Sequence, residues 1–244
     1  MLPEIAAGGW ALLVIAALTV GISKTALPGA GTIAVAIFAG VLPARASTAT
    51  LLVLLIVGDV FALLAYRRHA DRRTLLRLAP AVIAGLLVGV VFLALADDGS
   101  VRRVIGVILL VLIAFTLWQR RVAPVVTPRR SVAAAYGTLG GFTTMVANAG
   151  GPVMSMYFLA ARFPVKTFLG TAAWFFAIVN IAKLPFSIGL GLLTPAGLLI
   201  DLVLVPAVLV GAFAGRLLAD RLDQALFERI VIVLTVVGAV YLLW

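Results

Sequence analysis

The 244-residue chain is 64% apolar and 11% charged, with a mean hydropathy of +1.23, whereas soluble domains carry about 25% charged residues, so water is not the solvent of most of its surface. The net charge of +10 comes from Lys and Arg residues in short loops beside apolar runs, with no basic face and interleaved aromatics, which excludes nucleic acid as a partner. The absence of Cys and the single His69, in an arginine-rich loop, exclude disulfides and thiolate metal sites, so we expect no metal and no cofactor.

Ten apolar segments follow one another along the chain, and a helix needs roughly 20 such residues to cross a bilayer core of about 30 Å. The first segment lacks a small-residue cleavage site, so we expect it to stay in the mature protein. The pattern predicts an all-α polytopic membrane protein. The segments are 9–26, 30–42, 47–66, 75–96, 102–119, 131–148, 151–161, 167–188, 196–218 and 227–244.

The second half of the chain resembles the first. A shift of 121 residues places Gly29 on Gly150, Pro43 on Pro164, Arg45 on Lys166 and Asp59 on Asn180. After a five-residue insertion the shift is 126, and the string Pro-Ala-Val-x-x-Gly-x-x-x-Gly occurs at 80–89 and again at 206–215. Repeated halves are common in transporters, although such glycines also pack membrane helices in any protein. We predict a first transmembrane repeat at 1–122, a short cytoplasmic linker at 123–130 and a second transmembrane repeat at 131–244.

The basic loops predict the orientation, because Lys and Arg gather on the cytoplasmic side of a membrane. If each short second segment returns the chain to the side where its repeat began, all basic residues other than Lys24 and Lys183 lie inside except Arg45, Arg102 and Arg103. If the first two segments of each repeat form one interrupted span, the two sides of the membrane carry nearly equal numbers of basic residues. We favour the first arrangement, which places both termini outside the cytoplasm and makes the two repeats inverted in topology.

The second segments, 30–42 and 151–161, rise only about 20 and 16 Å as helices, so neither crosses the bilayer. We therefore expect each repeat to contain a broken or re-entrant helix pair plus three transmembrane helices. Irregular backbone at membrane depth lies buried in protein or lines a polar cavity, because its N–H and C=O groups find no partner in lipid. The two breaks therefore indicate a site.

Both breaks, at 21–31 and at 143–152, have glycines just before a short segment. A helix that starts there aims N–H groups and its positive dipole end at a cavity, and nearby hydroxyl, amide and lysine groups replace part of an oxyanion's hydration shell. The alternative is a tight turn at the membrane surface with Lys24 extended to headgroups. The candidate anion-binding residues are Ser23, Lys24, Thr25, Pro28, Gly29 and Gly31 at the first break and Thr143, Thr144, Asn148, Gly150 and Gly151 at the second.

Asp59 and Lys183 lie deep inside apolar segments, where a charge is costly enough to indicate function. The repeat places Asn180 opposite Asp59, and Lys183 follows Asn180 by three positions on the same helix face, so Asn180 and Lys183 join the candidate site. Asp59 is the candidate coupling residue, which pairs with Lys24 or Lys183 or shuttles a proton. A purely structural ion pair is the alternative.

Two further charged residues lie toward opposite ends of one segment. We expect the side chains of Asp201 and Arg216 to extend to the membrane interface without a functional role.

Three motifs carry a family resemblance. They are Gly-Ile-Ser-Lys-Thr-Ala-Leu-Pro-Gly-Ala-Gly at 21–31, Leu-Ile-Val-Gly-Asp at 55–59 and Tyr-Arg-Arg-His-Ala-Asp at 66–71. With the glycine-rich ninth segment, they resemble the TauE/SafE family of sulfite and organosulfonate exporters over nearly the whole chain. The resemblance implies a glycine-rich break early in each half, at Gly29 and Gly31 and at Gly150 and Gly151. This chain differs from the family's glycine run at Lys24, Thr25 and Pro28, and at Pro152.

The resemblance implies export of sulfite, an organosulfonate or a related small acid. With the lysines and helix ends it leads to the hypothesis of a secondary transporter in the cell inner membrane, driven by a proton or ion gradient. It would work by alternating access at a midplane site between the repeats that includes Lys24, Asn148, Asn180 and Lys183. An anion channel and a membrane scaffold subunit are the alternatives.

We expect no enzyme, because Ser23, Ser155 and Ser187 have no histidine partner within the membrane. The expected partners are the lipid bilayer and a small anionic solute, and the sequence leaves a homo-oligomer open.

Overall fold

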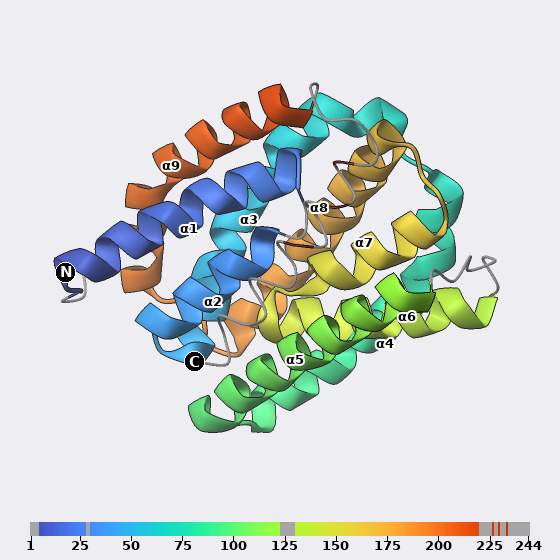
Figure 1. Ribbon diagram of the computed structural model, residues 1–244. Helices are drawn as coiled ribbons and strands as arrows, with labels where there is room; N and C mark the ends of the chain where they lie inside the picture. The colour runs from blue at the N-terminus through green and yellow to red at the C-terminus, as the bar shows by residue number, and fades with distance from the viewer. Residues whose placement is uncertain are drawn as a thin grey trace.

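The structure is a computed structural model that describes residues 5–27, 30–122 and 130–219 and the single positions Leu226, Arg229 and Val233. Within these ranges it contains helices and no strand (Figure 1). The helices are α1 (Ala7–Thr25), α2 (Gly31–Val41), α3 (Ala44–Tyr66), the 3-10 helix η2 (Arg67–His69), α4 (Arg72–Leu95), α5 (Asp98–Val122), α6 (Arg130–Ala147), α7 (Gly150–Ala160), α8 (Val165–Gly189) and α9 (Pro195–Ala219). They match the predicted segments to within a few residues, and the last predicted segment, 227–244, lies outside the described residues.

Five of the described helices are long and apolar enough to cross a membrane: α1, α3 with η2, α4, α8 and α9. Large apolar side chains on their outer faces, among them Leu64, Leu76 and Leu202, are more than half exposed, which suits contact with lipid rather than water. The prediction of an all-helical, multi-pass membrane protein is confirmed at this level.

Each short helix folds back along the helix before it. A Cβ placed on Gly31, at the start of α2, would lie 2.9 Å from Ser23 Oγ near the end of α1. At the other end of the pair, a Cβ on Gly9 would lie 3.4 Å from Val41, the last residue of α2. Helix α2 therefore returns toward the side where α1 began.

The second half forms the same kind of hairpin from α6 and α7. A Cβ on Gly150 would lie 2.8 Å from Thr144 Cβ at the turn, and one on Gly140 would lie 2.8 Å from Sδ of Met154 farther along α7. The short helices are buried among the others, with Phe38 of α2 and Phe158 of α7 fully enclosed.

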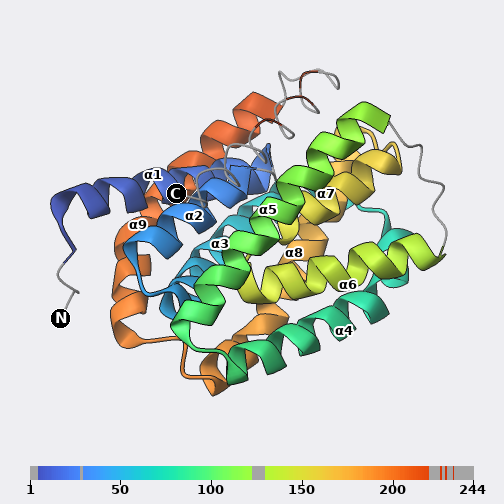
Figure 2. The same cartoon turned by 60° about the horizontal axis from the view of Figure 1, so that its bottom comes forward.

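Glycines let α1 and α9 pack with their backbones in contact. A Cβ on Gly21 would collide with the carbonyl oxygen of Val208, and one on Gly211 would collide with that of Leu18. Farther along both helices, a Cβ on Gly215 would lie 2.9 Å from Cα of Ile22. The residues in contact rise together in number, from Leu18 and Gly211 to Ile22 and Gly215, so α1 and α9 run parallel. The two helices lie side by side at one edge of the bundle in Figure 1 and in Figure 2.

The pair α4 and α6, at the opposite edge, uses glycines in the corresponding places (Figure 2). A Cβ on Gly141 would collide with the carbonyl oxygen of Val82, and one on Gly85 would collide with that of Thr138. Gly141 of α6 corresponds to Gly21 of α1 at a shift of 120 residues. Gly211 of α9 corresponds to Gly85 of α4 at a shift of 126 residues. The glycines of the repeated string therefore pack helices, as the structural alternative expected.

Helices α3 and α8 cross the middle of the molecule in opposite directions. Both begin directly after a proline, Pro43 and Pro164, as the repeat predicts. Near its start α8 packs Gly170 against the carbonyl oxygen of Tyr66 at the end of α3, and farther along Asn180 reaches Asp59. The turns of the hairpins α1–α2 and α6–α7 meet beside these two helices.

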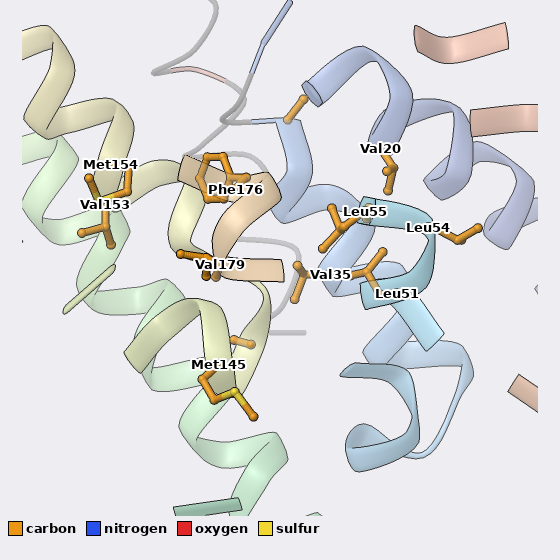
Figure 3. Close-up of a cluster of buried hydrophobic side chains, with 14 of the residues drawn as sticks. Val20, Val35, Leu51, Leu54, Leu55, Met145, Val153, Met154, Phe176 and Val179 are labelled. Atoms are coloured by element: carbon orange, nitrogen blue, oxygen red, sulfur yellow. The ribbon is translucent and has the colours of Figure 1, made fainter. Parts of the chain in front are cut away.

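Figure 3 shows how the interior is filled around this wall. Val20, Val35 and Leu55 come from the first three helices, and Val153 and Phe176 come from the facing helices α7 and α8. All five are buried. This apolar packing surrounds a few polar groups, which therefore lie in a medium of low dielectric constant.

Candidate functional site

The two chain breaks meet at a small cavity of about 30 Å³ between α3 and α8. Its wall contains residues from both halves of the chain. Eight of the predicted site residues line it: Ser23, Lys24, Gly31, Asp59, Thr144, Asn148, Gly151 and Asn180.

Lys24 is held by a carboxylate. Its Nζ lies 2.6 Å from Oδ1 of Asp59, and the two side chains are 7% and 2% exposed. The other carboxylate oxygen accepts a 2.7 Å hydrogen bond from Nδ2 of Asn180. The Lys24 ammonium also stands 4.7 Å from the centre of the Phe176 ring, within the range of a cation–π contact. The two charges therefore neutralise each other, and both oxygens of Asp59 have partners.

Lys183 is held by neutral oxygens only. Its Nζ donates to the carbonyl oxygen of Thr144 at 2.7 Å, to Oδ1 of Asn148 at 2.5 Å and to Oδ1 of Asn180 at 3.5 Å. Three acceptors surround one amine nitrogen, an arrangement that suits the three N–H donors of an ammonium. Its side chain is 2% exposed.

Asn148 connects the second break to both central helices. Its backbone has a φ of 52°, in the left-handed region that Asn tolerates better than most residues. This conformation directs its amide between α3 and α8, where Nδ2 donates to the carbonyl oxygen of Thr48 at 2.8 Å while Oδ1 accepts from Lys183. Asn148 lines the cavity and Lys183 does not, so the amine of Lys183 lies behind the cavity wall, bound to the Asn148 amide.

Two helix N-termini face the cavity. The first residues of α2, Gly31 and Thr32, and the second and third of α7, Gly151 and Pro152, line it. The N-cap residues of both helices are alanines, and neither offers a capping hydrogen bond. Helix N-termini without a side-chain cap bind anions, because their N–H groups and dipole ends favour negative charge.

The charges around the cavity do not cancel. Lys24 and Lys183 are opposed by the single carboxylate of Asp59 among the described residues in contact there, so the group has one net positive charge when all three are ionised. Within residues 5–27, 30–122 and 130–219, no three His, Asp or Glu side chains gather as metal ligands would. The arrangement is suited to holding a small anion.

A family model described as sulfite exporter TauE/SafE matches residues 13–242. The chain belongs to the TauE/SafE family. Membership confirms the resemblance seen in the motifs at 21–31, 55–59 and 66–71, and it places the chain in a family of membrane transporters rather than of enzymes. No curated protein and no solved structure matches the chain.

Several predicted site residues of this TauE/SafE chain lie away from the cavity. The hydroxyl of Thr25 donates to the carbonyl oxygens of Gly21 and Ala212 and so faces α9. The hydroxyl of Thr143 donates to the carbonyl oxygen of Leu139 in its own helix. Gly150 packs at the turn of its hairpin, and Pro28 and Gly29 lie outside the described residues.

Sequence reasoning missed several residues of the cavity wall. Phe176 and Leu55 line it, as does Thr32 beside the predicted Gly31. Phe176 precedes Asn180 by four positions, and Leu55 precedes Asp59 by four. Residues four apart share a helix face, so extending the two polar faces by one turn would have found both.

The expectation for Asp201 was wrong. The side chain is 2% exposed, and neither carboxylate oxygen has a hydrogen-bond partner. Asp201 is the seventh residue of α9, on the face that packs against its neighbours rather than at a helix end, so its short side chain does not reach an interface. Arg216 is exposed near the other end of α9, as expected.

Proposed function

We propose that this TauE/SafE chain is a secondary transporter that moves a small anion across the inner membrane by alternating access. The observation that carries the proposal is the cavity where the N-termini of α2 and α7 meet, neither with a side-chain cap from its N-cap alanine, with the amine of Lys183 directly behind the wall on Thr144 and Asn148. The anion-binding residues would be Ser23, Lys24, Gly31, Thr144, Asn148, Gly151, Asn180 and Lys183. The family's description supports sulfite or an organosulfonate as the solute.

The paired helix contacts support two repeats of inverted topology. The arrangement that the basic loops favour requires α1 and α9 to point the same way, α4 and α6 to point the other way, and α3 and α8 to oppose each other. The contacts Leu18–Gly211 and Ile22–Gly215 give α1 and α9 a common direction, and the contacts Ala81–Gly137 and Gly89–Met145 give α4 and α6 a common direction. The contacts Tyr66–Gly170 and Asp59–Asn180 give α3 and α8 opposite directions. The hairpins α1–α2 and α6–α7 support the same arrangement, with both termini outside the cytoplasm.

The size of the cavity supports a conformational cycle. A water molecule needs about 10–15 Å³ of such space, so the cavity of about 30 Å³ has room for about two waters and not for a hydrated oxyanion. Binding therefore requires the walls to move apart. A scaffold subunit would have no use for two lysines buried at this depth.

Binding of anions to the detergent-purified protein tests the proposal. We would titrate sulfite, sulfate, sulfoacetate, taurine and acetate by calorimetry and follow the melting temperature in parallel. At least one of these anions should bind saturably, and Lys24→Ala and Lys183→Ala should each raise Kd at least tenfold without unfolding the protein. A hydrogen bond to a charged group contributes about 1.5–3 kcal/mol.

Lys166→Ala is the matched control, because Lys166 is exposed at the start of α8 and should leave Kd unchanged. Wild-type affinity in both cavity variants, or no binding of any of the five anions, would contradict the proposed site.

A further inference from the structure

Asp201 has no compensation for a negative charge. Both carboxylate oxygens are buried without a hydrogen-bond partner among the residues that the structure describes. The residue lies about 9 Å along α9 from the helix start, beyond the first turn in which the helix dipole acts. An ionised carboxylate in such a place costs several kcal/mol, whereas the protonated acid costs much less.

The charged groups on the helices around α9 have other partners. Helix α9 packs against α1 and α3. Lys24 of α1 and Asp59 of α3 bind each other, and Arg45 at the start of α3 donates to the carbonyl oxygen of Ala96. On α9 itself, Arg216 lies four helical turns away and is exposed. No side chain on these elements neutralises Asp201 in the part of the chain that the structure describes.

Helix α9 packs closely on α3 one turn before Asp201, whereas the corresponding part of the other half borders a cavity. By the shift of 126, Asp201 corresponds to Leu75. Leu75 lines an apolar cavity of about 230 Å³ that separates α4 from α8, with Val82 and Phe175 among the other lining residues. Helix α9 instead packs closely along α3, with Gly197 against Thr50. Leu75 of the first half therefore borders a cavity, whereas the corresponding Asp201 of the second half is buried in packed protein.

A cavity with charged residues in its wall lies beside the start of α9. The cavity, of about 250 Å³ and lined by Arg45, Asp98 and Thr194, lies at the α8–α9 connection. Thr194 precedes Asp201 by seven residues, about 10 Å along the helix. Because the cavity is lined by the start of α3 and by the residue that precedes α9, a separation of these two helices would extend it along α9 toward Asp201.

We propose that Asp201 is a proton-binding site of the transport cycle, protonated while the α3–α9 contact is closed and able to release its proton when that contact opens. The proposal rests on the transporter function proposed above and adds the coupling ion. Asp59 is less suited to this role, because Lys24 and Asn180 occupy both of its oxygens.

Transport in proteoliposomes tests the proposal with radiolabelled sulfite as the probe. Counterflow, in which labelled sulfite exchanges with unlabelled sulfite and no gradient is imposed, does not require net proton movement. Accumulation of sulfite driven by an imposed pH gradient does. Asp201→Asn should keep counterflow within about twofold of wild type and should lose at least tenfold of the accumulation driven by the pH gradient.

Asp97→Asn is the control for removal of an acidic charge. Asp97 is fully exposed outside the membrane-spanning segments, and hydrogen bonds from the side chain and backbone of Ser100 hold its pKa below the usual value. It is therefore ionised throughout the tested range, and its variant should keep both activities.

The outcomes separate the two proposals. Accumulation that survives in Asp201→Asn, or wild-type accumulation that ignores the pH gradient while counterflow proceeds, would overturn the role of Asp201 and leave the transporter intact. Absence of sulfite counterflow in the wild type would instead count against the proposed function.

A measurement on the wild-type protein covers the case in which Asp201→Asn fails to fold. Dicyclohexylcarbodiimide adds to protonated carboxyl groups in apolar surroundings, and mass spectrometry locates the adduct. We expect an adduct on Asp201 that forms at least tenfold faster than on the ion-paired Asp59 and that slows as the pH rises. An unmodified Asp201 at every pH would overturn the proposal.

Discussion

Lys24 of the first half and Lys183 of the second stand at the same cavity but differ in their partners. Lys24 faces the carboxylate of Asp59 at 2.6 Å, whereas Lys183 donates only to neutral oxygens. The outer helix pairs, α1–α9 and α4–α6, are packed by equivalent glycines. The difference teaches that the repeated scaffold sets the cavity, while residues that differ between the halves set its charge.

The largest effect should come from breaking the Lys24–Asp59 pair. Asp59→Leu leaves a buried ammonium without its carboxylate, so we expect a loss of about 3–5 kcal/mol in the free energy of unfolding. The double variant Lys24→Leu/Asp59→Leu should recover most of this loss, because it removes both charges together. Denaturant unfolding in detergent measures both, and a double variant no more stable than Asp59→Leu would show that the pair is not coupled.

Removing Lys183 should act on binding more than on folding. Lys183→Met deletes the charge that no carboxylate neutralises and leaves three oxygens without their donor, so anion affinity should fall about ten- to hundredfold, at about 1.5–3 kcal/mol for a charged hydrogen bond. Calorimetric Kd values for the anion that binds wild type provide the test. An unchanged Kd would place the unneutralised charge outside the binding site.

The two halves should respond alike when their scaffold glycines are changed. A Cβ on Gly85 or Gly211 collides with a backbone carbonyl of the neighbouring helix, so Gly85→Ala and Gly211→Ala should each cost about 1–3 kcal/mol of stability. Gly106→Ala is the control, because nothing lies within 4 Å of a Cβ there. Losses that differ strongly between Gly85→Ala and Gly211→Ala would argue against equivalent packing.

The smallest effect should come from Asn148, where two variants separate backbone from side chain. Asn148→Gly keeps the left-handed φ of 52° and loses the amide, whereas Asn148→Ala loses both. Both should weaken anion binding, but Asn148→Ala should be less stable by about 1 kcal/mol because alanine is strained in this region. Equal melting temperatures for the two variants would contradict the role assigned to the backbone.

Much of the fold was predictable because membrane helices follow from apolar length alone, and the predicted segments matched the described helices. The contact between Asp59 and Asn180 followed from the repeat. The shift of 121 was wrong within the first helices, where the contacts of Gly21 and Gly141 correspond at 120. A single extra residue at the second break explains the change, and irregular backbone gives no periodic signal that would locate it.

The site was less predictable than the helices. The sequence placed Lys24 and Lys183 in the interior but did not decide which of them pairs with Asp59, because that choice depends on how α1 and α8 are rotated. For the same reason Asp201 was assigned to the interface, although the face of α9 on which it lies is the one packed against other helices.

Alternating access itself can be measured on a single introduced cysteine, because the chain has none of its own. Ala173→Cys places a thiol in the cavity wall, and a membrane-impermeant cationic methanethiosulfonate can be applied from either side of the membrane. A second pair of cysteines, Thr50→Cys/Gly197→Cys, can lock the α3–α9 contact, because a Cβ on Gly197 would lie 3.8 Å from Thr50 Cβ, within disulfide range.

Alternating access predicts that the thiol introduced at Ala173 is modified from each side before the lock forms and from one side only after it. Saturating sulfoacetate, which unlike sulfite does not react with the reagent or the disulfide, should slow modification from both sides before the lock forms. Modification from both sides that survives the lock would indicate a continuous pore and would contradict alternating access.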